Sequence, residues 1–238
     1  MNRLLALSIV LATVAPSTAG DMAQLDILGF SADGKIFAFE EYGVQDGSGF
    51  PYANRFYIDT ATDSFVAGSP VRVRLDDEAA TVASARDKAR AQGAAIITDE
   101  ILRANAGYLA GFNAVTELSA DADGISVNPR PVEPAIDPAL SFKLEQFALA
   151  APAGSCDGID GITGFRLSRT DGDQGQPVVI HEDKAIPKSR GCPQGYRVGG
   201  VQTFYPESGQ PVFAVMVAVR SFGFEGPDYR WIAITGKL

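Results

Sequence analysis

Hydrophobic and polar residues alternate over most of the segment from Leu25 to Arg74, which is the pattern of half-buried β-strands. The sequences LDILGF and KIFAFEEY flank a turn with Asp33 and Gly34 at its tip, and RFYIDTATDSF and FVAGSPVRVRL repeat this arrangement. Asp-Gly is a preferred pair in tight hairpin turns. The first part of the chain is therefore predicted to form a meander of four strands.

The spacing of the apolar residues changes at Asp76. The sequence DDEAATVASARDKARAQG begins with acids and carries basic residues toward a final glycine, which is typical of a helix. AIITDEILRANAG predicts a second, shorter helix. Arg86, Lys88 and Arg90 do not stack on one side of the first helix, so we expect them on a solvated face. The region near 76–106 is thus predicted as a helical insertion.

Strand patterns return after residues 119–138, a segment rich in Pro, Asp and Ala that predicts a loop and could mark a domain boundary. They comprise ALSFKLEQFALA, ITGFRLSR, QPVVIHE, YRVGGVQTFY, PVFAVMVAVRSF and YRWIAIT. PVFAVMVAV is apolar on both faces, so we predict a central strand covered on both sides. Residues 20–238 are expected to form a single domain that is mainly β with a helical insertion, α+β overall.

Residues 1–19 have the pattern of a secretory signal peptide. Arg3 supplies a positive start, LLALSIVLATVA is an uncharged apolar run, and small residues up to Ala19 precede Gly20. The run is shorter than the roughly 20 residues that span a bilayer. We therefore expect cleavage and export to the periplasm or the exterior, with no stable membrane span afterwards.

The net charge disfavours one class of partner, and the cysteine content predicts a disulfide. The formal net charge is −9, and an acidic chain gains nothing from counterion release on nucleic acid, which makes nucleic acid an unfavourable partner. Cys156 and Cys192 are the only cysteines, and an oxidising exterior favours a disulfide between them. Such a bridge would stabilise the fold by about 3 to 4 kcal/mol.

The two ends of the chain contain an internal repeat. NRFYIDT at 54–60 is similar to YRWIAIT at 229–235, and the preceding IFAF is similar to VFAV. Within each pair of strands the connector contains Gly and Phe, GVQDGSGFPYA in one and SFGFEGPD in the other. A repeated hairpin predicts that the two pairs pack together with their connectors side by side. Chance similarity between alternating strands is the competing interpretation.

Two resemblances follow from these segments. GFSADGKIFAF with FYIDTAT resembles one blade of the TolB-like β-propeller repeats, which implies a propeller-blade-like sheet. FAFEEYGVQDGSGFPY, SRGCPQGYRVGG and FEGPDYRW resemble a family of predicted secreted bacterial proteins that is grouped only as a domain of unknown function. This second resemblance covers most of the chain after the signal and implies export and a shared fold without an activity.

Catalytic and metal chemistry find little support. His181 is the only histidine and no G-x-S-x-G is present, so we expect a solvated loop histidine. Asp171, Asp173 and Glu182 occupy the first, third and twelfth positions of an EF-hand-like loop, but Gln176 stands where that loop needs glycine. These three carboxylates are weak candidates for calcium. The sequence predicts no cofactor and no metal site.

Three functions remain open. Aromatic side chains on Gly-Pro connectors suit a recognition surface for an envelope protein or glycan, and the candidates are Phe50, Tyr52, Phe222, Phe224 and Tyr229. A carboxylate-dependent hydrolase of an envelope polymer would use Glu41 and Glu225, with burial raising the pKa of Glu41. A purely structural role is the third. The sequence favours binding, leaves the enzymatic question open, and identifies neither the ligand nor the partner.

Overall fold

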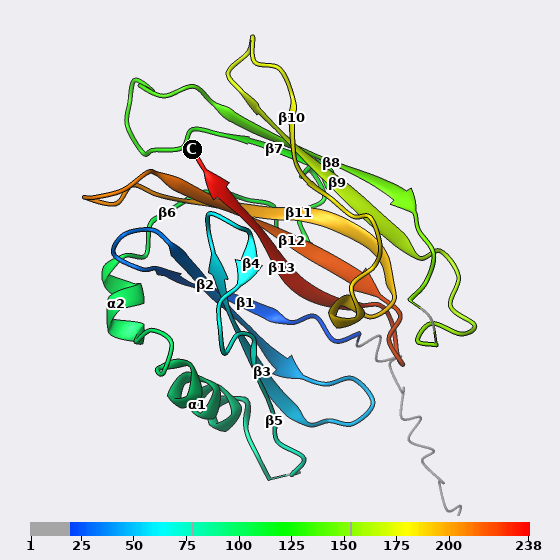
Figure 1. Cartoon of the computed structure of the whole chain (residues 1–238). Coiled ribbons are helices and arrows are strands. Elements are labelled where there is room, and N and C mark those ends of the chain that lie inside the picture. The colour runs from blue at the N-terminus through cyan, green and yellow to red at the C-terminus, as the bar shows by residue number, and fades with distance from the viewer. Residues whose placement is uncertain (1–19, 78, 153) are drawn as a thin grey trace, which may run out of the picture.

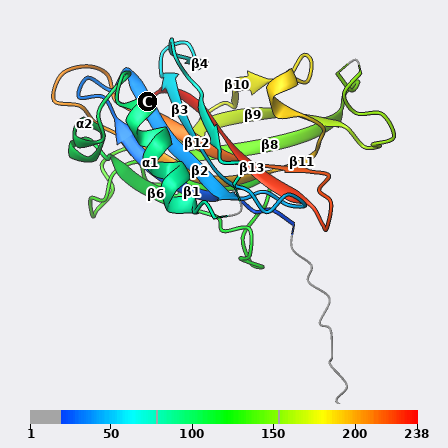
Figure 2. The same cartoon turned by 90° about the horizontal axis from the view of Figure 1, so that it is seen from below.

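The computed structural model describes residues 20–77, 79–152 and 154–238, so the predicted signal at 1–19 lies outside the described residues. This part of the chain contains three antiparallel sheets in layers, and two helices cover the outer face of the first sheet (Figures 1 and 2). The expectation of a mainly β fold with a helical insertion is confirmed. Because the sheets are layered and not closed into a barrel, the propeller-like arrangement is not confirmed.

The first sheet is the meander predicted from the sequence, with one strand more than expected. Gly34 has φ of +73° at the tip of the first turn, a conformation that glycine adopts without strain. β4 and β5 both pair with β3, so the sheet divides at that edge. The strands are β1 (Gln24–Phe30), β2 (Ile36–Val44), β3 (Pro51–Asp59), β4 (Ser64–Phe65) and β5 (Val71–Arg74).

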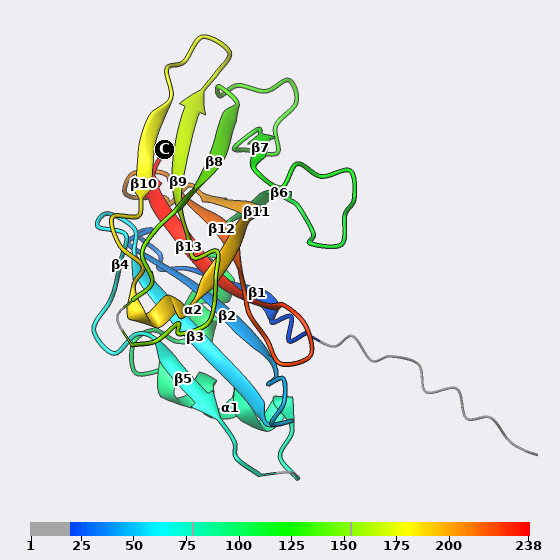
Figure 3. The same cartoon turned by 90° about the vertical axis from the view of Figure 1, so that its right-hand side faces the viewer.

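The other two sheets come from the second half of the chain. The central sheet has the order β13-β12-β11-β6, and the outer sheet has the order β10-β9-β8-β7. Figure 3 shows the central sheet between the outer sheet and the first sheet. The strands of the central sheet are β6 (Tyr108–Phe112), β11 (Pro193–Phe204), β12 (Val212–Ser221) and β13 (Asp228–Lys237). Those of the outer sheet are β7 (Gly124–Val127), β8 (Leu140–Ala148), β9 (Thr163–Asp171) and β10 (Val178–Glu182).

β12 is buried on both faces, as its apolar sequence predicts. Val215 and Val217 pack with the outer sheet, whereas Ala214 and Met216 pack with the first sheet. The face toward the first sheet carries two alanines because it meets the bulky side chains of Phe37, Phe39 and Phe56. Small residues opposite large ones let the two sheets approach closely. This core joins the N-terminal hairpin β2–β3 to the C-terminal hairpin β12–β13.

Both predicted helices form, but the first begins later than expected. α1 (Val82–Gly93) starts after Thr81, whose side chain accepts a hydrogen bond from the backbone of Ser84. α2 (Asp99–Ala104) follows. Arg86 of α1 is not simply solvated: it pairs with Glu40 at 2.7 Å and lies 3.8 Å over the ring of Tyr42. The helix is thereby anchored to the sheet.

The loop predicted at residues 119–138 contains the short strand β7, and a short 3-10 helix, η1 (Lys188–Arg190), precedes β11. Cys156 and Cys192 form the predicted disulfide, with their Cα atoms 5.7 Å apart. The bond joins the β8–β9 connection to the start of β11. Together with Ile162 and Ile186 the cysteines form a small separate cluster of apolar residues.

Candidate functional site

The two connectors of the internal repeat lie side by side. The backbone N–H of Glu225 donates a hydrogen bond to Asp46 at 2.9 Å, and Phe224 lies against Gly47. They meet because their hairpins share one core, in which Phe39 and Phe56 face Met216 and Trp231. We call residues 44–51 and 222–227 together the connector surface. The expected packing of the two hairpins is confirmed.

The aromatic candidates differ in exposure. The side chains of Phe222 and Phe224 are 66% and 82% exposed, so they stand out from the surface. Phe50 and Tyr229 are half-buried. Tyr52 is buried, and its hydroxyl donates to Asp21 at 2.9 Å. Tyr52 therefore supports the surface from below and does not present its ring to a partner.

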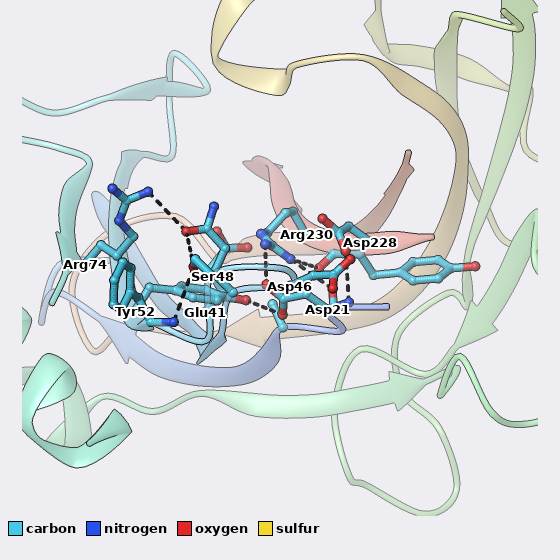
Figure 4. A network of polar contacts seen from close by, with 12 residues as sticks. Asp21, Glu41, Asp46, Ser48, Tyr52, Arg74, Asp228 and Arg230 are labelled. Carbon is cyan, nitrogen blue, oxygen red and sulfur yellow. Dashed lines mark hydrogen bonds and ion pairs between the residues drawn. The ribbon is translucent and has the colours of Figure 1, made fainter. Parts of the chain in front are cut away.

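A polar network lies beneath the connectors (Figure 4). One carboxylate oxygen of Asp21 accepts from Tyr52, and the other pairs with Arg230 at 2.6 Å. The backbone N–H of Asp21 donates to Asp228 at 2.9 Å. Burial raises the pKa of Asp21 despite the neighbouring Arg230, and burial raises the pKa of Tyr52 well above its ordinary value. The N-terminal segment is thus tied to the start of β13.

Glu41 belongs to the same network, and its contacts indicate a structural role. It is buried, and its two oxygens accept hydrogen bonds from the side chain of Asn54 and the backbone N–H of Trp231, each within 2.9 Å. Burial raises the pKa of Glu41, and the two donors only partly offset this effect. Glu225 is exposed on the connector. Glu41 lines a groove whose lining does not include Glu225.

β13 is an edge strand of the central sheet: the backbone of residues 21–23 pairs with Tyr229 near its start, and side chains cover part of the remaining free edge. Glu41 accepts from Trp231, and Asp63 accepts from the backbone N–H of Thr235 at 2.7 Å. Asp63 has φ of +50°. Carboxylates that occupy edge N–H groups oppose the addition of a further strand. The free edge is therefore protected where Glu41 and Asp63 reach it.

An arginine-rich hollow of about 450 Å³ adjoins the connector surface. Arg74 pairs with Asp76 at 2.6 Å and donates to Gln45 at 3.1 Å, while Arg230 is held by Asp21. Arg72 lies 5.4 Å over the ring of Phe56 and forms no ion pair with any described residue. The hollow is lined by Gln45, Tyr52, Asn54, Arg72, Val73, Arg74, Asp76 and Arg230.

These arginines were missed in the sequence. VRVRL places Arg72 and Arg74 on the same face of β5, a pattern that signals two cations side by side on a strand. The third cation, Arg230, comes from β13 at the other end of the chain, and no local pattern could bring it there. Asn54, Arg72 and Arg230 also line a neighbouring groove of about 570 Å³, which continues along β13.

His181 lies in that groove and not in a solvated loop, so that expectation was wrong. It belongs to β10, stacks on Phe165 with ring centroids 4.6 Å apart, and contacts Asp183 at 3.1 Å. Arg190 also pairs with Asp183, at 2.6 Å. Although burial opposes the charge of Asp183, the bonds from His181, Arg190 and the backbone of Phe165 lower its pKa. His181 and Arg190 of this cluster line the groove.

The carboxylates proposed for calcium do not converge. Asp171 ends β9 and pairs with Arg169, whereas Glu182 ends β10 and pairs with Arg166 at 2.9 Å. Because Val178 lies opposite Arg169 and Glu182 lies opposite Arg166, the hairpin register keeps Asp171 and Glu182 apart. Asp173 lies in the turn between the strands. Over the residues that the structure describes, no group of three ligating side chains is close enough for a metal ion.

The fold and the site define a mainly β protein with three layered antiparallel sheets and an aromatic and arginine-rich surface at one end. The chain belongs to the family described as predicted secreted protein (DUF2259), whose model matches residues 38–237. The chain is accordingly a secreted protein. In the described residues no helix is long and apolar enough to cross a membrane. No curated protein and no solved structure matches the chain. The family description supplies no activity.

Proposed function

We propose that this secreted protein binds a partner of the cell envelope, a protein or a glycan, through the connector surface and the adjoining arginine-rich hollow. The observation that carries the proposal is the exposure of Phe222 and Phe224 on a connector that is held in place by its neighbour. Exposing large apolar side chains to water raises the free energy of the unbound protein, and burying them in a complex lowers it.

The surroundings of the two phenylalanines support the same proposal. Aromatic and arginine side chains dominate the binding energy of interfaces, and here they adjoin each other. Arg72 is free of any ion pair with the described residues, so a partner could use it without first breaking a bond. The network of Asp21, Tyr52 and Arg230 holds the residues beneath the connectors in place. Little conformational entropy is therefore lost there when a partner binds.

A hydrolase that uses Glu41 and Glu225 finds less support. Both oxygens of Glu41 are engaged by Asn54 and Trp231, so this carboxylate holds two parts of the fold together. A general acid must instead reach the leaving group of the substrate. If turnover of an envelope polymer were found and were lost in Glu225→Gln with folding retained, the hydrolase would replace the binding role.

Affinity capture with matched variants tests the proposal. The exported chain is immobilised and exposed to a soluble envelope extract of the source cell, in parallel with the double variant Phe222→Ser/Phe224→Ser. Leu118→Ser is the control, because Leu118 is 99% exposed and lines neither the hollow nor the groove. We expect the same partner on the wild type and the control, and none on the double variant. Equal capture by all three chains, or by none, would count against the connector surface.

A further inference from the structure

A second hollow, of about 510 Å³, lies at the opposite edges of the same two sheets. It is lined by residues of β1, α2 and β6, three elements that are labelled in Figure 1, together with one residue of β11. β1 and β6 are edge strands of the first and central sheets, whereas the groove described above follows β13, the other edge of the central sheet. The two sites share no lining residue, and the ring of Phe112 in one lies 6.3 Å from the ring of Trp231 in the other.

The walls of this hollow are mainly aliphatic and aromatic. The lining includes Leu25 and Ile27 of β1, Leu109 and Phe112 of β6, and Leu102 of α2. The side chains of Leu109 and Phe112 are 50% and 48% exposed, although β6 pairs with the largely buried strand β11. A concave apolar surface of this volume is in the range of ligand sites.

One buried polar group points to the ligand. Gln202 of β11 is only 5% exposed, and its Nε2 donates to the carbonyl of Ala106 at 2.6 Å. A carbonyl can only accept, so this bond fixes which end of the amide is the oxygen. That oxygen, Oε1, is buried and accepts no hydrogen bond from any described residue. An unmet buried acceptor costs about 1 to 3 kcal/mol, which a donor on a ligand would recover.

The backbone around Gln202 is irregular at this point. The pairing of β6 with β11 shifts by one residue between Val201 and Gln202, so Ala110 is the extra, unpaired residue of a β-bulge in β6. Bulges re-aim side chains and occur frequently beside functional sites. Here the bulge lies where the apolar wall of β6 meets the amide of Gln202.

We propose that this hollow binds a neutral alkyl chain that carries one hydroxyl group, with the chain along Leu109 and Phe112 and the hydroxyl donating to Gln202 Oε1, which a shift of the surrounding side chains must uncover because that atom is buried. The charged groups of the rim are already engaged: Asp26 is held by Arg86, Asp99 is held by Arg55, and Arg103 donates to the backbone carbonyl of Asp99. A cationic head group would have to displace one of these arginines, and the net negative charge of the chain disfavours an anionic one. The same acidity opposes approach to an anionic bilayer, so the ligand is a free monomer and not a lipid embedded in a membrane.

Two matched probes test this assignment. The exported chain is titrated with 1-octanol and with octyl methyl ether, which has a comparable chain but no donor, and binding is followed by NMR. We expect saturable shifts at Gln202, Leu109 and Phe112, and at least about tenfold tighter binding of the alcohol, which corresponds to about 1.4 kcal/mol. Equal affinity for the two probes, no saturable binding, or shifts confined to the arginine-rich hollow would each overturn the proposal.

Variants separate the two contributions. Phe112→Ala should weaken both probes, whereas Gln202→Met should abolish the preference for the alcohol while keeping the binding of the ether. Retained binding of the ether shows that the Gln202 variant is folded at this site. Leu118→Ser and Phe224→Ser should bind both probes like the wild type. A failure of the ligand proposal would therefore leave the binding role of the connector surface untouched. Self-association that Phe112→Ala abolishes and octanol leaves unchanged would identify a second copy as the occupant and contradict the proposal.

Discussion

Glu41 Oε2 accepts a hydrogen bond from the backbone nitrogen of Trp231 at 2.8 Å, joining residues that are 190 positions apart in the chain. This bond connects the N-terminal hairpin to the free edge of the C-terminal one. Both residues also line the groove along β13, so the bond fixes part of the wall of the groove.

Replacing Glu41 by alanine should destabilise the protein. The variant would leave the Trp231 N–H and the amide of Asn54 without their acceptor in a buried place, at a cost of about 2 to 4 kcal/mol in the free energy of unfolding. Urea unfolding measures this change. Glu225→Ala is the matched control and should stay within about 0.5 kcal/mol, because Glu225 is exposed. An equally small change for Glu41→Ala would show that the bond contributes little.

The pH dependence of stability should reflect the buried Glu41. Burial raises the pKa of Glu41 in the folded state above its ordinary value of 4.5, so the folded state retains this proton to higher pH than the unfolded state does. The contribution of Glu41 to stability therefore falls as the pH rises from about 4.5 through the folded pKa.

Glu41→Gln removes this titration and should leave a stability curve that declines less over the same pH window. The loss of one acceptor adds an offset that does not change with pH. Unfolding by urea at several pH values between about 4 and 8 measures both effects. Glu225→Gln should follow the wild-type curve, and a Glu41→Gln curve parallel to the wild type would contradict the assignment.

The disulfide should contribute to stability and leave the connector surface unchanged. It closes a separation of 36 residues, so Cys156→Ser/Cys192→Ser should lower the free energy of unfolding by about 3 to 4 kcal/mol. Calorimetry of the double variant, and of the wild type with and without a reductant, checks this. The reduced wild type and the variant should agree, and a reductant should not alter the variant.

Serine in place of Phe222 and Phe224 should leave the fold intact. Both side chains lie outside the core, so the free energy of unfolding should change by less than about 0.5 kcal/mol. Tyr52→Phe is the informative comparison, because it removes the hydrogen bond to the buried Asp21 and should cost about 1 to 2 kcal/mol. If the double serine variant were as destabilised as Tyr52→Phe, the phenylalanines would be structural.

Local sequence patterns predicted which strands and helices form better than they predicted which of these elements contact one another. The two-faced apolar run of β12, the disulfide and the meeting of the two connectors all follow from pattern or pairing. The start of α1 was misplaced because Asp76 and Asp77, which resemble a first helical turn, instead bind Arg74 and close a turn at Ala79. Competition from such side chains is not visible in helix propensity.

The candidate site was only partly predictable. Alternation along β2 places Glu41 on the same face as Phe37 and Phe39, but it does not show that the distant β13 covers Glu41 and donates to it. Tyr52 is buried for a related reason, since Asp21 and Arg230 arrive from the two ends of the chain. The arginine-rich hollow needs β5 and β13 together. These contacts depend on how the sheets are layered, which a strand pattern does not contain.

Site-specific photo-crosslinking in the source cell tests the central claim most directly. A photoreactive side chain replaces Phe224 in one chain and Leu118 in another, both of which are highly exposed. The account predicts a discrete crosslinked product from position 224 that is absent from position 118 and is weakened by Arg72→Ala. Identical products from both positions, or no product from position 224, would contradict a binding role for the connector surface.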